Sequence, residues 1–155
     1  MGIRDDHAKR EAESWDELMA QVARLSPAQR EREGVVPGWS TKDLLWHCAY
    51  WANDVVQHLP ALMDGTFVDP FEADDALGDR MNAEIATQAK AMTWDETMAR
   101  AAEARSGVLT AWAALPNEPT DAAAEWFAEE SFVHYDEHAE EIGRFAESLG
   151  ASIDP

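Results

Sequence analysis

The chain has 155 residues, of which 46% are hydrophobic and seven are tryptophan, and this content excludes an intrinsically disordered protein. The length suits one folded domain over residues 1–155. Its 31 acidic and 12 basic residues give a formal net charge of −19, which would repel phosphates and anionic lipids, so we expect no nucleic acid and no membrane among its partners.

Apolar residues that recur every three or four positions predict helices over most of the chain. The first helix is expected over residues 6–25, because Ser26 and Pro27 stop it and residues 27–31 suit one further turn. Two glycines and a proline within residues 34–38 then predict a loop.

A second helix is expected over residues 41–59. Ser40 is a good N-terminal cap, and Asp43 completes an acidic version of the capping box. Pro60 is expected to kink or end this helix, because proline has no backbone N–H to donate. One face is apolar and predicts core contacts for Leu44, Leu45, Cys48, Trp51, Val55, Leu59 and Leu62.

The second half of the chain continues the helical pattern. Residues 65–70 predict a loop, and a weakly patterned helix is expected over 73–89. A capping box at residues 93–96 opens a helix over 94–115, and the last helix is expected over 121–149 in one or two pieces. No segment alternates with the period of a strand, so the predicted fold class is all-α, a four-helix bundle with one extra short helix.

Three histidines fall on the predicted inner faces. His134 and His138 are four residues apart on the last helix, so they share one face. His47 lies on the inner side of the second helix. Two imidazoles from one helix and one from another can hold a metal ion and leave an open position, as catalytic sites do. The spacing leaves a second interpretation open, in which these histidines are buried and neutral without a metal.

Other side chains near these histidines are candidates for supporting roles. Glu141 follows His138 by three residues and is a candidate base, or a carboxylate that fixes the tautomer of the histidine. Trp39 and Trp51 lie near His47 in the sequence and are candidate walls of an apolar substrate pocket, with plain core packing as the alternative.

The remaining reactive residues give no strong prediction of function. His7 and His58 are expected to be surface or accessory residues, and Cys48 is expected to pack in the core. The sequence has no Gly-rich phosphate loop and no Gly-x-Ser-x-Gly motif, which leaves nucleotide-binding and serine-hydrolase interpretations without support. One cysteine and a start without an apolar signal core predict a cytoplasmic location.

Two segments resemble the DinB-like superfamily. Residues 36–51 are similar to its GWS-x-KD-hh-x-H-x-x-x-W segment, and residues 132–142 are similar to its closing helix, which carries a His-x-x-x-His pair. The order and separation of the segments also fit, over residues 12–149. The resemblance implies a four-helix bundle with zinc or nickel held by His47, His134 and His138.

Two branches of the superfamily come close. One contains the mycothiol-dependent maleylpyruvate isomerases and related thiol transferases, in which a metal activates a low-molecular-weight thiol. Many of those proteins have glutamate at the position of His134, so this chain departs from them there. The other is the ClbS/DfsB-type group, linked to detoxification of a reactive metabolite and similar in its HY-x-EH pattern.

The resemblance implies a metal-dependent enzyme that transfers a thiol such as mycothiol or bacillithiol to a small electrophile, or isomerises that electrophile. The alternatives are a detoxifying hydrolase and a non-catalytic protein that sequesters a small molecule. The expected partner is therefore a small-molecule substrate. An apolar helix face left uncovered in the monomer would also favour a homodimer, which is common among the relatives.

Overall fold

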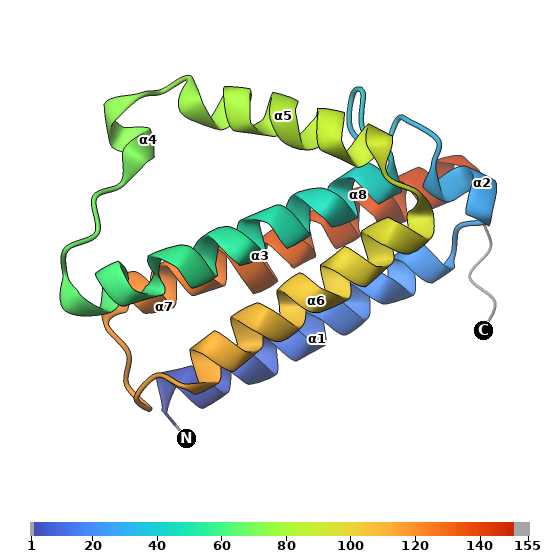
Figure 1. Cartoon of the computed structure of the whole chain (residues 1–155). Helices are drawn as coiled ribbons and strands as arrows, with labels where there is room; N and C mark the ends of the chain where they lie inside the picture. Colours follow the sequence, from blue (N-terminus) through green and yellow to red (C-terminus); the bar gives the residue numbers. More distant parts are fainter. Residues whose placement is uncertain (1, 151–155) are drawn as a thin grey trace.

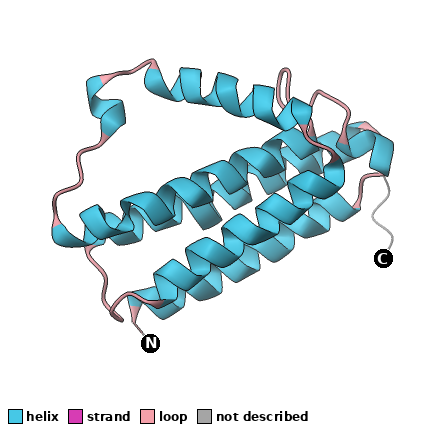
Figure 2. Cartoon of the chain, viewed as in Figure 1, coloured by secondary structure: helices cyan, strands magenta, loops and turns pink. Residues whose placement is uncertain are grey.

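The computed structural model describes residues 2–150, and the regular secondary structure in this part is helical (Figure 2). The predicted all-α four-helix bundle is confirmed. Its four long members run side by side (Figure 1). They are α1 (Ile3–Ala23), α3 (Thr41–Asp64), α6 (Trp94–Ala113) and a continuous run of α7 (Asp121–Ala128), η1 (Glu129–Val133) and α8 (His134–Ser148).

The shorter helices lie around this bundle. Within it, α3 packs mainly against α6, and α1 packs mainly against α8. The helix α5 (Leu77–Ala91) contacts α3 from outside the bundle (Figure 1). It is the extra helix that the sequence predicts, although it begins four residues later than expected, after the single turn α4 (Pro70–Ala73). The single turn α2 (Pro27–Arg30) follows α1.

The two predicted capping boxes are present. Ser40 N–H donates to Asp43 Oδ2 at 2.9 Å, and Asp43 N–H donates to Ser40 Oγ at 3.2 Å. At the start of α6, Thr93 N–H donates to Glu96 Oε2 at 2.8 Å, and the reciprocal bond is 3.2 Å. Each box satisfies two N–H groups that a helix start leaves unpaired, so these residues fix where α3 and α6 begin.

The prediction that Pro60 ends or kinks the second helix is wrong in one respect, because α3 continues to Asp64. The turn after Pro60 is held by tertiary contacts. Leu62 is buried, and its carbonyl accepts a hydrogen bond of 2.9 Å from Thr120 Oγ1. Gly65, with φ of 75°, then closes the helix in the left-handed conformation that glycine adopts readily.

Replacing Pro60 by alanine is expected to raise the free energy of unfolding by about 1–2 kcal/mol. Alanine restores a backbone N–H inside the helix and has a propensity about 3 kcal/mol better than proline, from which the gain of unfolded-chain entropy subtracts about 1 kcal/mol. Urea unfolding would measure the change. Gln57→Ala, one turn earlier and also exposed, is the matched control and should stay within about 0.5 kcal/mol.

The core residues of α3 predicted from its apolar face are all buried. The largest fully buried side chains are Trp112, Tyr135 and Phe127, which come from α6, α8 and α7. Trp112 and Phe127 stack with ring centroids 4.1 Å apart, so they join α6 to the last helical run. None of the helices in the described part is long and apolar enough to cross a bilayer.

Candidate metal centre

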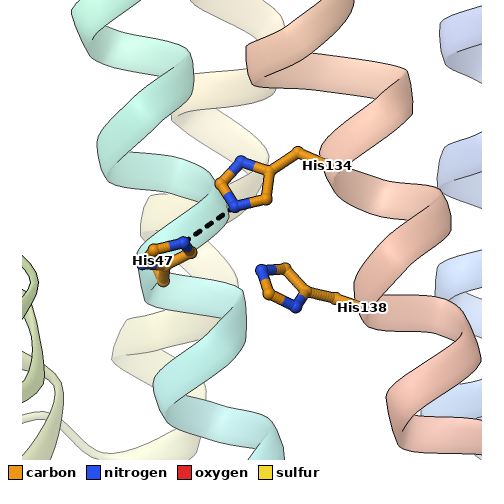
Figure 3. A group of neighbouring side chains, drawn as sticks. All are labelled: His47, His134 and His138. Atoms are coloured by element: carbon orange, nitrogen blue, oxygen red, sulfur yellow. Dashed lines mark hydrogen bonds between the residues drawn. The ribbon is translucent and has the colours of Figure 1, made fainter. Parts of the chain in front are cut away.

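The fold brings His47, His134 and His138 together between α3 and α8. One ring nitrogen from each lies within 4.8 Å of the other two (Figure 3). A tetrahedral ion with bonds of about 2.0–2.1 Å places two of its ligand nitrogens about 3.3 Å apart. The cluster is therefore compact enough for one ion after small rotations of the rings.

The ring nitrogens of this cluster are unusually short of partners. Nε2 of His47 and Nε2 of His134 are 2.7 Å apart and share one hydrogen bond. Nε2 of His138 is buried and has no hydrogen-bond partner in the described structure, and the same holds for Nδ1 of His47. Buried polar atoms are normally paired, so an unpaired nitrogen that faces two other imidazoles fits a metal ligand.

Burial sets the charge of the rings. It lowers the pKa of His47 to about 3, with the nearby His138 adding to the effect. It also lowers the pKa of His134 to about 2, with His138 and His47 adding to the effect. Both rings are therefore neutral near pH 7, which is the form that binds metal ions.

Carboxylates contact the outer edges of two of these rings. Glu141 Oε2 lies 2.7 Å from Nδ1 of His138, so Nδ1 donates and Nε2 is the nitrogen left for a ligand bond. Glu130 Oε2 lies 3.6 Å from Nδ1 of His134, too far for a hydrogen bond. Burial raises the pKa of Glu130 to about 8, with the charges of Asp54 and Glu129 adding to the effect.

The two tryptophans singled out from the sequence both contact His47. The rings of Trp39 and His47 meet edge to face, with centroids 5.3 Å apart. The rings of Trp51 and His47 also meet edge to face, with centroids 6.3 Å apart. Of the two, Trp51 lines a cavity beside His47 and His134, whereas Trp39 is partly buried and packs against the apolar core.

That cavity has a volume of about 280 Å³ and lies between α3, α5 and the last helical run. His47 and His134 are among the residues that line it. The sequence did not single out Asn82, Glu129, Val133 or Glu137 as site residues, yet all four line it. Asn82 is on α5, whose weak pattern gives no sign of which helix it contacts.

The segment η1 is a π-helical stretch that ends directly before His134. Such stretches insert an extra residue into a turn and are frequent at functional sites. Here it carries Glu129, Glu130 and Val133 to the cavity. The sequence allowed for two pieces in the last helix but gave no signal for this local widening.

The other reactive residues lie outside the cluster. His7 is half-buried, with its ring centroid 5.7 Å from that of Trp112, and His58 pairs with Asp54 at 3.2 Å. Cys48 is buried as predicted, and burial raises the pKa of its thiol, so it is not an activated nucleophile.

Residues 12–133 match the family model described as mycothiol maleylpyruvate isomerase N-terminal domain. The match covers most of the chain, which therefore belongs to this DinB-like family. The matched region includes His47 and ends one residue before His134. Searches of curated proteins and of solved structures gave no significant match.

Proposed function

We propose that this mycothiol-related DinB-like protein is a metal-dependent enzyme that transfers a low-molecular-weight thiol to a small electrophile or isomerises that electrophile. The observation that carries the proposal is the convergence of ring nitrogens from His47, His134 and His138 within 4.8 Å, beside a cavity. Family membership supports a thiol of the mycothiol type.

Each residue of the site has its own role in this proposal. His47, His134 and His138 would hold zinc or nickel and leave a coordination position open. When bound, such a metal lowers the pKa of a thiol or water and supplies a nucleophile at neutral pH. Glu141 accepts a hydrogen bond from Nδ1–H of His138 and so keeps Nε2 of that ring free for a ligand bond. Trp51 and Asn82 line the space in which the electrophile would lie.

The test is metal content by mass spectrometry, on untagged protein purified without chelators. Wild type is expected to hold about one equivalent of zinc or nickel, and His134→Ala and His138→Ala are expected to lose it, because two ligands are too few for a stable tetrahedral site. His58→Ala removes a histidine outside the cluster and should keep the metal. Absence of metal in wild type after dialysis against zinc would overturn the proposal.

Removing the carboxylate behind His138 is expected to weaken metal binding without abolishing it. Glu141→Gln should lower zinc affinity about 10–100-fold, the effect usual for an outer partner of a ligating histidine. Glu140→Gln, at the exposed neighbouring position, is the matched control. Competition with a chromogenic chelator measures both, and equal affinities for the two variants would show that Glu141 does not orient the ring.

A second candidate function is hydrolysis of a strained or activated substrate. It is favoured by the histidine at position 134, where many thiol-dependent relatives have glutamate, and by the resemblance of residues 134–138 to the ClbS/DfsB-type group. Turnover of a model electrophile without any thiol would support this candidate. A shift in melting temperature with ligand but no product would instead support a non-catalytic binding protein.

A further inference from the structure

The cavity in front of the histidines is rimmed by negative charge. Glu129 and Glu137 line it and are exposed, and neither is paired with a basic side chain in the described structure. No lysine or arginine is among the described residues that line it. The two basic side chains of α5 are already paired, Arg80 with Asp74 and Lys90 with Glu33.

Carboxylate-bearing ligands need a different environment. Proteins that bind carboxylates supply arginine or lysine, whose N–H groups form charge-assisted hydrogen bonds with both oxygens. Here an incoming carboxylate would meet two unpaired carboxylates and no lysine or arginine, so the only positive charge near it would be the metal ion of the proposed function. The remaining polar lining consists of the amide of Asn82, the indole of Trp51, the two imidazoles and Glu130, and none of these is a basic side chain that would pair with a carboxylate as lysine or arginine does.

The site is nevertheless built to receive a ligand. His138 is 7% exposed, and its Nε2 has no partner in the described structure although it faces the other two rings (Figure 3). The two glutamates therefore line the same cavity as His47 and His134, whose Nδ1 atoms are also unpaired in the described structure, and their charge acts on any ligand that enters it.

We infer that this cavity favours uncharged or cationic molecules over carboxylates, so that its substrates differ in charge from maleylpyruvate, the dicarboxylate in the family description. The inference rests on the proposed function and specifies its substrate class. It applies to the thiol as well as to the electrophile, and it favours a thiol without carboxylates over glutathione, which carries two.

Three small thiols of similar size provide the probe: cysteamine, 2-mercaptoethanol and 3-mercaptopropionate, with a positive, neutral and negative tail. Their binding to the zinc-loaded protein is measured by calorimetry for wild type and for the double variant Glu129→Gln/Glu137→Gln, called the rim variant. Comparing the two proteins with the same thiol cancels the acidity of that thiol. The control variant, Glu103→Gln/Glu147→Gln, changes the net charge by the same amount at exposed positions that do not line this cavity.

In the rim variant, 3-mercaptopropionate is expected to bind about 3- to 30-fold more tightly and cysteamine correspondingly more weakly, as expected for unit charges several ångströms apart near a surface. Affinity for 2-mercaptoethanol should change by less than about twofold. In the control variant all three should stay within about twofold, and 1 M salt should reduce the charge preference in wild type.

The outcomes separate the two proposals. Thiol binding that is the same in the rim variant for all three probes overturns the charge selection and leaves the proposed function standing. Equal effects in the rim and control variants show that only net charge matters and also overturn it. A zinc-loaded wild type that binds none of the thiols overturns the thiol-transfer function, and the inference falls with it.

Discussion

Arg105→Ala is expected to lower the free energy of unfolding by about 3–5 kcal/mol. Arg105 on α6 donates from Nε and Nη2 to the two carboxylate oxygens of Glu11 on α1, at 2.8 and 2.9 Å. The side chain of Glu11 is completely buried. Removing the arginine strands a carboxylate in the interior, and breaking a buried ion pair in this way costs far more than the pair itself contributes.

The guanidinium also covers an aromatic ring. Its carbon lies 5.2 Å from the ring centroid of Trp15, so the alanine variant loses that contact and the packing of the arginine stem as well. Arg105→Lys keeps the charge but not the two parallel hydrogen bonds, and we expect a smaller loss of about 1–2 kcal/mol. Urea unfolding at pH 7 measures both.

A double variant would test the cause. Glu11→Met combined with Arg105→Leu should recover most of the loss, because apolar residues of similar volume replace a buried ion pair at little cost. A deficit below about 1 kcal/mol for Arg105→Ala at pH 7 would mean that Glu11 escapes to solvent.

The ion pair between Glu11 and Arg105 was not predictable from the sequence, whereas the helix starts were. The helices and their capping boxes depend on residues within a few positions of one another, so Ser40 with Asp43 and Thr93 with Glu96 were readable from the chain. Glu11 and Arg105 are 94 positions apart. Glu11 does fall seven residues before Leu18 on the buried face of α1, and a charge at such a position is a signal for a buried partner.

The candidate site was likewise predictable only in part. His47, His134 and His138 could be proposed from the sequence because they fall on the predicted inner faces of two helices and match a family pattern. The structure places their rings together. The two cavity glutamates, Glu129 and Glu137, could not be proposed from the sequence, because they look like ordinary surface carboxylates in a chain of net charge −19. Their position at the cavity depends on η1, a backbone irregularity, and on where α5 packs.

Zinc is expected to raise the free energy of unfolding of the wild-type protein by about 4 kcal/mol when its free concentration is 1,000 times the dissociation constant. An ion held by three residues from α3 and α8 binds the folded chain and not the unfolded one, so its binding energy adds to stability. For a chain of this length the melting temperature should rise by roughly 10 °C. Differential scanning fluorimetry at a fixed free zinc concentration measures it.

The same measurement on variants assigns the effect to the cluster. His134→Ala should show a zinc-dependent shift of less than about 1 kcal/mol, whereas His58→Ala should show the full shift, because His58 lies outside the cluster. Without zinc, His134→Ala should differ little from wild type. Its ring contributes one hydrogen bond, to His47, and loss of that bond is worth about 1 kcal/mol. An equal shift in both variants would place the zinc elsewhere on this acidic chain, since exposed carboxylates also bind divalent ions weakly. Because stability reports the ion without any substrate, this result decides whether the three histidines hold a metal before the reaction itself is known.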